Sequence, residues 1–117
     1  MKTLRNILFA LIVLLVAPLS SFAGKEDVIT EHKSVTGNCD QCKNRIENAA
    51  YIKGVKFASW DADKQDLTVK YDTTKTNSDL ILQSIARAGH DNEKYKATDE
   101  DYKKLPKCCK YKTTGKH

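Results

Sequence analysis

Proline and long hydrophobic runs are both scarce in this chain of 117 residues. The two prolines are Pro18 and Pro106, so no proline lies between them to form a cis-proline loop. One long apolar run, from Ile7 to Ala17, is present, and no second run of that length follows it. This run is shorter than the roughly 20 residues that span a bilayer. Because no other apolar run of that length follows, we also expect no membrane-spanning helix in the rest of the chain.

Charge of one sign is not concentrated in any long block. The formal net charge is +5, and Lys2 and Arg5 lie in a segment without acids, so residues 24–117 carry +3. The sequence has no glycine-rich loop to hold a phosphate and no set of nucleophile, base and orienting residue. These absences argue against nucleic-acid binding, and we expect a protein that is not an enzyme.

Residues 1–23 have the features of a secretory signal peptide. Two basic residues precede the apolar run, and Ser21-Phe22-Ala23 places small residues at the −3 and −1 positions of a cleavage site before Gly24. We therefore expect this segment to be removed and the remaining soluble protein to be exported, to the periplasm. A chain this short forms one domain with a modest core.

Four cysteines occur as two pairs, the C-x-x-C motif Cys39/Cys42 and the adjacent Cys108 and Cys109. An even number of cysteines in an exported protein suggests disulfides, with three possible pairings. The adjacent pair can bond to itself only with strain. Two long-range disulfides and two pairs of metal ligands both remain open from the sequence.

The order of elements is predicted from apolar periodicity and turn residues. Four strands are expected at residues 27–36, 55–61, 67–72 and 90–97. Two helices are expected between them, the first with Asp40 as N-cap and the second with a Thr76/Asp79 capping box. This order predicts an α+β fold, a ferredoxin-like βαββαβ sandwich with a four-stranded antiparallel sheet and two helices. Trp60 is expected in the core, whereas the alternation does not decide whether Phe57 faces the core or the solvent.

The C-x-x-C motif is expected where the first strand gives way to the first helix. Free N–H groups at a helix start, helped by Lys43 and Arg45, are expected to lower the thiol pKa values. A thiolate pair without a carboxylate cluster suits Cu(I) first, and Zn(II), Cd(II) or Hg(II) next. A closed zinc site needs four ligands and only two are local, so an open site that transfers its ion is favoured.

The pattern resembles the heavy-metal-associated domain family. The C-x-x-C motif, followed by the stretches GVKFASWDADKQDLTVKYD and LILQSIARAGHD, carries this resemblance over residues 28–97. The resemblance implies that Cys39 and Cys42 bind a metal ion. It also implies a metal-transfer protein partner, such as a transporter or efflux component. The expected organisation is a heavy-metal-associated domain at residues 24–98 and a lysine-rich tail at 99–117, with one helical turn near 99–105.

Two departures from the family enlarge the set of candidate ligands. Gly37-Asn38 stand where the family often has Gly-Met, and His90 stands where Tyr or Phe is common after Gly89. His90 is a candidate third ligand, or else it fills the space of the aromatic. The tail pair could add thiolates to the site, form disulfides in the metal-free protein, or make a separate site. The candidate metal ligands are Cys39, Cys42, His90, Cys108 and Cys109.

Two other functions are compatible with the cysteines. A thiol-disulfide oxidoreductase would also use a C-x-x-C motif, but the Asp40-Gln41 pair and the absence of a facing proline disfavour it. A disulfide-stapled interaction domain is the second alternative. His32 and His117 are expected to be solvated side chains.

Overall fold

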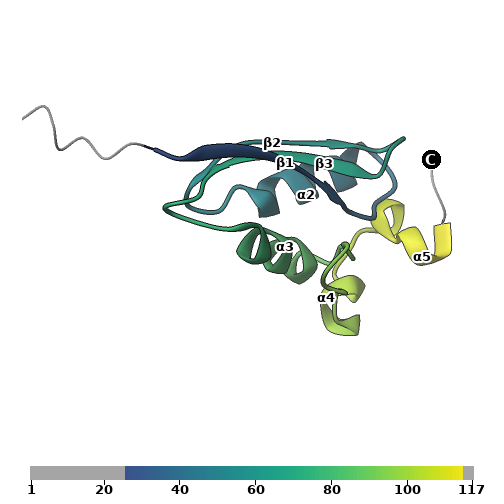
Figure 1. The fold of residues 1–117 in the computed structure, drawn as a ribbon. Helices are drawn as coiled ribbons and strands as arrows, with labels where there is room; N and C mark the ends of the chain where they lie inside the picture. The colour runs from purple at the N-terminus through teal and green to yellow at the C-terminus, as the bar shows by residue number, and fades with distance from the viewer. Residues whose placement is uncertain (1–25, 115–117) are drawn as a thin grey trace, which may run out of the picture.

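A computed structural model of the protein describes residues 26–114 (Figure 1). The predicted signal peptide at residues 1–23 and His117 lie outside the described residues. Within the described part, no helix is both long enough and apolar enough to cross a bilayer.

A three-stranded antiparallel sheet forms one layer of the fold. Its strands are β1 (Val28–Ser34), β2 (Val55–Asp61) and β3 (Asp66–Asp72), in the order β1-β3-β2. The helices α2 (Asp40–Ala50) and α3 (Ser78–Arg87) lie on one side of the sheet (Figure 1). The chain then continues through α4 (Asp99–Lys103), the 3-10 turn η2 (Lys107–Cys109) and α5 (Tyr111–Thr114). The three predicted strands up to Asp72, the two main helices and the turn near Asp99 are present as expected.

A β-bulge explains why the apolar residues of β2 fall on both phases of its alternation. The register shifts between Val55 and Phe57, so Val55 pairs with the inward-facing Tyr71 while Ala58 and Trp60 also face the core. A bulge inserts one residue and reverses the side that each following side chain takes. Phe57 is thereby turned outward and is 47% exposed.

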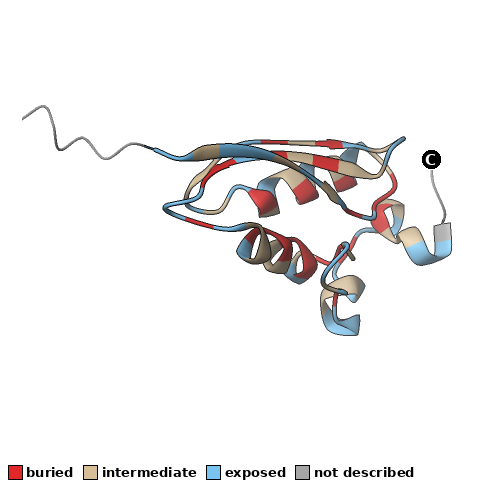
Figure 2. Ribbon diagram, in the orientation of Figure 1, coloured by how far each residue is buried: buried red, intermediate tan, exposed pale blue. Residues whose placement is uncertain are grey.

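The core lies between the sheet and the two helices. The buried cluster draws its members mainly from β2, β3, α2 and α3, all of which carry buried positions in Figure 2. Trp60 is 1% exposed, as predicted, and its indole N–H donates to Val35 O at 2.9 Å. Leu105 and Cys109 of the tail belong to the same buried cluster. The C-terminal segment is therefore packed into the domain that precedes it.

The predicted start of the second main helix is shifted by one residue. Asn77, and not Thr76, is the N-cap of α3, and its Oδ1 accepts from Leu80 N at 2.9 Å. Asparagine is a stronger N-cap than threonine, because its side-chain oxygen reaches the free N–H groups of the first turn easily. The predicted helix is otherwise where the pattern placed it.

The predicted fourth strand at residues 90–97 is wrong, so the four-stranded sheet is corrected to three strands. The segment makes a single bridge between Asn92 and Val35, with Glu93 N donating to Ser34 O. Asn92 instead folds the chain into a turn, because its Oδ1 accepts from the N–H groups of Lys94 and Tyr95. Polar asparagine competes in this way with strand pairing by bonding its own backbone.

We predict that Asn92→Ala lowers the free energy of unfolding by about 1–3 kcal/mol, because it removes the turn bonds and the bond from Asn92 Nδ2 to Leu82 O. Urea unfolding followed by tryptophan fluorescence measures the change. Asn44→Ala, at an exposed position of α2, is the matched control and is expected to change stability by less than about 0.5 kcal/mol. Equal effects of the two substitutions would contradict this role of Asn92.

Candidate metal site

The C-x-x-C loop is preceded by a glycine that packs tightly against the core. A Cβ atom at Gly37 would lie 3.0 Å from the Trp60 ring and 3.1 Å from atoms of Cys42 and Ile46. The N–H of Gly37 donates to the side-chain oxygen of Gln65 at 3.0 Å. The loop therefore rests directly on the core, and its first cysteine follows two residues later.

The two cysteines of the motif lie at the start of α2. Cys39 is the N-cap residue in an extended conformation, and its carbonyl accepts from Lys43 N at 3.0 Å. Asp40, the predicted N-cap, is instead the first helical residue. The helix therefore begins one residue earlier than the preference of aspartate for the N-cap position predicted. Cys42 lies in the first turn and is fully buried, whereas Cys39 is partly exposed.

The pKa of the Cys39 thiol is lowered by its position at the helix start. Burial by itself would raise this pKa, but hydrogen bonds from the backbone N–H groups of Cys42 and Gln41, and then from the side chains of Cys108 and Cys42, outweigh it. A thiolate at this position is stabilised by the unpaired N–H groups of the helix. The pKa of the Cys39 thiol is thus held below its ordinary value.

The two cations next to the motif bond to groups other than the thiols. Lys43 Nζ donates to Glu47 and to Trp60 O, and Arg45 Nη2 donates to Ala88 O at 3.0 Å. The sequence suggested that both cations would lower the thiol pKa values. In the structure the leading stabilising groups at Cys39 are backbone N–H groups.

The C-terminal segment brings two further sulfur atoms to the loop. The Sγ atoms of Cys39, Cys108 and Cys109 lie within 4.8 Å of one another, and those of Cys108 and Cys109 are 4.0 Å apart. Burial raises the pKa of Cys109, and the neighbouring thiols of Cys42 and Cys108 raise it further. All four cysteines are free thiols. The structure therefore collects the two pairs, 66 or more residues apart in sequence, into one cluster of thiols.

Polar contacts join the cysteine loop, residues 36–43, directly to the tail. Asn38 Nδ2 donates to Cys108 O at 3.3 Å, and Cys39 Sγ lies 3.6 Å from the same oxygen. The thiol of Cys108 donates to Gln41 Oε1 at 2.7 Å. Asn38, which stands where the family often has methionine, is only 2% exposed. This residue thus binds the tail.

Tyr111 anchors the segment that follows the tail cysteines. Its hydroxyl donates to Gly89 O at 2.9 Å and accepts from Asp91 N at 3.0 Å. Its ring stacks on His90, with centroids 5.7 Å apart, and meets the Tyr102 ring edge-on at 5.2 Å. The tail thus places an aromatic ring against His90, the residue that follows this glycine.

His90 is fully buried and lies beneath Tyr111. Its Nδ1 bonds to Thr36 O at 2.8 Å, so Nδ1 carries the proton and Nε2 has a free lone pair. Burial lowers the pKa of the ring, which keeps it neutral. Nε2 has no hydrogen-bond partner among the described residues, but His90 is not in the three-sulfur group. Ligation by His90 stays a prediction.

Sequence reasoning did not identify three residues that hold the site together. These are Asn38, Gln41 and Tyr111. For Tyr111 a signal was present, because His90 leaves an aromatic position of the family unfilled and a tyrosine follows the tail cysteines by two residues. For the two amides no sequence signal existed, since their partner lies about 70 residues away.

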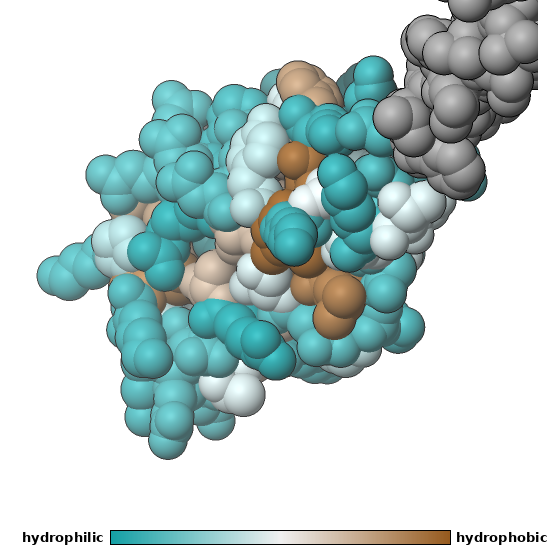
Figure 3. Space-filling view, turned by 90° about the vertical axis from the view of Figure 1, so that its left-hand side faces the viewer, coloured by the Kyte–Doolittle hydropathy of each residue, from teal (hydrophilic) through white to brown (hydrophobic). Residues whose placement is uncertain are grey.

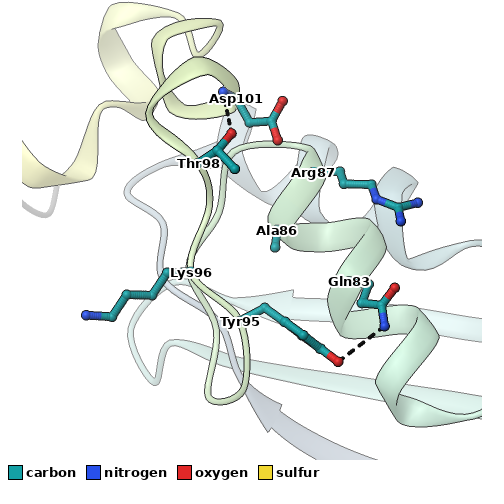
Figure 4. A pocket seen from close by; sticks show the side chains of 7 residues that line it. All are labelled: Gln83, Ala86, Arg87, Tyr95, Lys96, Thr98 and Asp101. Atoms are coloured by element: carbon teal, nitrogen blue, oxygen red, sulfur yellow. Dashed lines mark hydrogen bonds between the residues drawn. The ribbon is translucent and has the colours of Figure 1, made fainter.

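Other surfaces are separate from the thiols. A pocket beside α3 is lined by Gln83, Tyr95 and Asp101 among others, and no cysteine lines it (Figure 4). Figure 3 shows one end of the molecule, where a small hydrophobic area is surrounded by hydrophilic residues. His32 is exposed on β1 and bonds to Asp66 at 2.9 Å.

We predict that Cys39 is alkylated faster than Cys108 in the reduced, metal-free protein near pH 8. The pKa of Cys39 is lowered while burial raises that of Cys108, and the thiolate is the nucleophile. Timed reaction with iodoacetamide in a chelator, followed by peptide mass spectrometry, gives both rates. Both residues are partly exposed, so access is matched. Faster labelling of Cys108 would contradict the assignment of Cys39 as the thiolate.

Comparison with known proteins agrees with this geometry. The heavy-metal-associated domain matches residues 38–91. The chain is 34% identical over 55 residues to the copper chaperone CopZ of Staphylococcus haemolyticus, covering 46% of this chain and 81% of that protein. A solved CopZ metallochaperone has a TM-score of 0.53 at 29% identity, covering 55% of this chain and 98% of that one. A putative copper-ion-binding protein from Bacillus anthracis, at 21% identity and a TM-score of 0.56 over 59% of this chain and all of that one, shares the fold. The chain belongs to the heavy-metal-associated domain family.

Proposed function

We propose that this protein binds Cu(I) through Cys39 and Cys42 and acts as a non-enzymatic copper carrier in an exported compartment. The observation that carries the proposal is the group of free thiols at the start of α2. Cys39, Cys108 and Cys109 lie within 4.8 Å of one another, and the Cys42 thiol neighbours those of Cys39 and Cys109. Thiolates are soft ligands, and they select Cu(I) over hard cations.

The local charge supports a monovalent ion with thiolate ligands. Cu(I) bound by two thiolates is a unit with one net negative charge. The first turn of α2 offers backbone N–H groups to that charge, and these groups already stabilise the Cys39 thiolate. The similarity to the copper chaperone CopZ of Staphylococcus haemolyticus supports the same ion.

Zn(II), Cd(II) and Hg(II) are second choices for the same ligands. Zinc prefers four ligands in a tetrahedral arrangement, of which Cys39 and Cys42 supply two, so a zinc site here would also require both tail thiols. The carrier function also requires a partner protein whose thiols receive the ion. A transporter or efflux component in the same compartment fits this requirement.

Loss of the motif is expected to remove high-affinity copper binding. In Cu(I) titrations under reducing conditions against a competing chelator, Cys39→Ser combined with Cys42→Ser should weaken binding by about 100-fold or more. Changing only the groups that support metal ligands already costs about 10–100-fold. The control is His32→Ala, which removes an exposed histidine on β1 and should leave the affinity unchanged.

Unchanged affinity in the double variant would overturn the proposal. The oxidoreductase alternative has its own test, because turnover in an insulin-reduction assay would support it. A disulfide-stapled domain would instead show Cys39 and Cys42 blocked to thiol labels in protein taken from the exported fraction, whereas a carrier shows them free or protected by metal.

Export rests on the order of charged, apolar and small residues at the N-terminus. We expect the protein from the exported fraction to begin at Gly24, as measured by intact mass and N-terminal sequencing. Replacing Ala23 with a bulky residue should block cleavage, because the −1 position accepts only small side chains. Retention of residues 1–23 in the natural exported protein would contradict this part of the proposal.

A further inference from the structure

We propose that Cys108 and Cys109 join Cys39 in one enclosed Cu(I) site with at least three sulfur ligands, and that Tyr111 holds this site closed so that the protein retains its ion. This proposal rests on the proposed Cu(I)-binding function and specifies its ligands. It also predicts that the protein releases its ion slowly, in contrast to a carrier with an open site that delivers its ion rapidly.

The sulfur separations fit a three-coordinate ion. A metal–sulfur bond of about 2.3 Å, the length found at zinc, places the sulfurs of a planar three-coordinate site about 4.0 Å apart. Cys108 Sγ and Cys109 Sγ are already 4.0 Å apart, and Cys39 Sγ is within 4.8 Å of both. If the longer S···S distances shortened by less than the length of one metal–sulfur bond, all three sulfurs could bind the same ion. Each thiol that is still protonated loses its S–H proton to water when its sulfur binds Cu(I), whereas a thiolate binds directly.

The fourth sulfur lies next to the same group. Cys42 is fully buried in the first turn of α2, and its thiol is a neighbour of both Cys39 and Cys109. Cys42 and Cys109 form the buried side of the cluster, while Cys39 and Cys108 are partly exposed. An incoming thiol therefore reaches the cluster only from the side of Cys39 and Cys108.

Two sets of contacts hold the tail against the cysteine loop. Near the sulfurs, Asn38 Nδ2 bonds to Cys108 O and Gln41 Oε1 accepts from the Cys108 thiol. Beyond them, Tyr111 bonds to Gly89 O and to Asp91 N and stacks on His90. His90 in turn bonds to Thr36 O, three residues before Cys39. Tyr111 is thus a positioning residue. It ties the tail to Gly89 and Asp91 and, through His90, to the segment just before Cys39.

Closure by the tail has a consequence for exchange. A partner thiol that takes over the ion must replace a protein thiol, and the tail occupies the open side of a two-cysteine loop. Release is then slower while Tyr111 remains in place. Loss of the tail contacts should give a two-sulfur site that exchanges its ion faster.

Three variants separate these contributions. Cys108→Ser with Cys109→Ser removes both tail thiols, and Tyr111→Ala removes the anchor while keeping all four cysteines. Tyr51→Ala is the matched control, because Tyr51 is a half-exposed tyrosine at the other end of α2. Because Cys109 is part of the core, Cys108→Ser alone is included in case the double variant does not fold. Circular dichroism verifies the fold of each variant.

The measurements are X-ray absorption at the copper edge and the rate of Cu(I) transfer to a chelator. We expect three or more sulfur ligands in the natural protein and in Tyr51→Ala, and two in the variant without tail thiols. Transfer should be faster by about 10-fold or more in that variant and in Tyr111→Ala, by analogy with the loss of groups that orient ligands. Cys108→Ser should also speed transfer.

A measurement without metal tests the role of Tyr111 independently. In the reduced, metal-free protein, Tyr111→Ala should increase the alkylation rate of the buried Cys109, and Tyr51→Ala should not. An unchanged Cys109 rate would overturn the anchor. Two sulfur ligands in the natural protein, with Cu(I) still dependent on Cys39 and Cys42, would overturn this inference but leave the proposed function intact. Absence of Cu(I) binding in the natural protein would overturn both.

Discussion

The packing at Gly37 is the contact on which the rest of the site depends. Trp60 from the sheet and Ile46 from α2 meet there, and a β-carbon at this position would lie 3.0 Å and 3.1 Å from their atoms, closer than an ordinary van der Waals contact. Interiors of proteins are close-packed, so such a contact restricts the position of the backbone. The cysteine loop is thereby placed on the core, and α2 begins with its N–H groups directed at the thiols.

The C-terminal segment uses this fixed loop as its binding surface. Leu105 and Cys109 enter the core, while Tyr111 occupies the space above His90. Burial of these side chains compensates for the entropy of ordering the tail. The match to the family ends at residue 91, and the segment that follows it in this chain packs against the cysteine loop. The proposed retention of copper follows from that packing.

Much of the fold was predictable because the pattern of side chains repeats the geometry of the elements. Leu67, Val69 and Tyr71 alternate as a half-buried strand must, and the apolar positions of the helices recur with helical spacing. The strand at 90–97 was predicted wrongly, because Asn92 can bond either a partner strand or its own backbone. The bulge in β2 was likewise invisible, since only pairing with β3 shows that Val55 and Ala58 share a side.

The sequence by itself determined the soft chemistry of the site and its position at the start of a helix. Thiols spaced as C-x-x-C after a strand can meet on one loop, and that relation is local in the chain. Only the tertiary structure decided that Cys108 and Cys109 lie beside Cys39. The reason is physical, because Asn38 and Gln41 find their partner about 70 positions away in the chain, and Tyr111 finds its partner 22 positions away. No periodicity in a sequence encodes such partners.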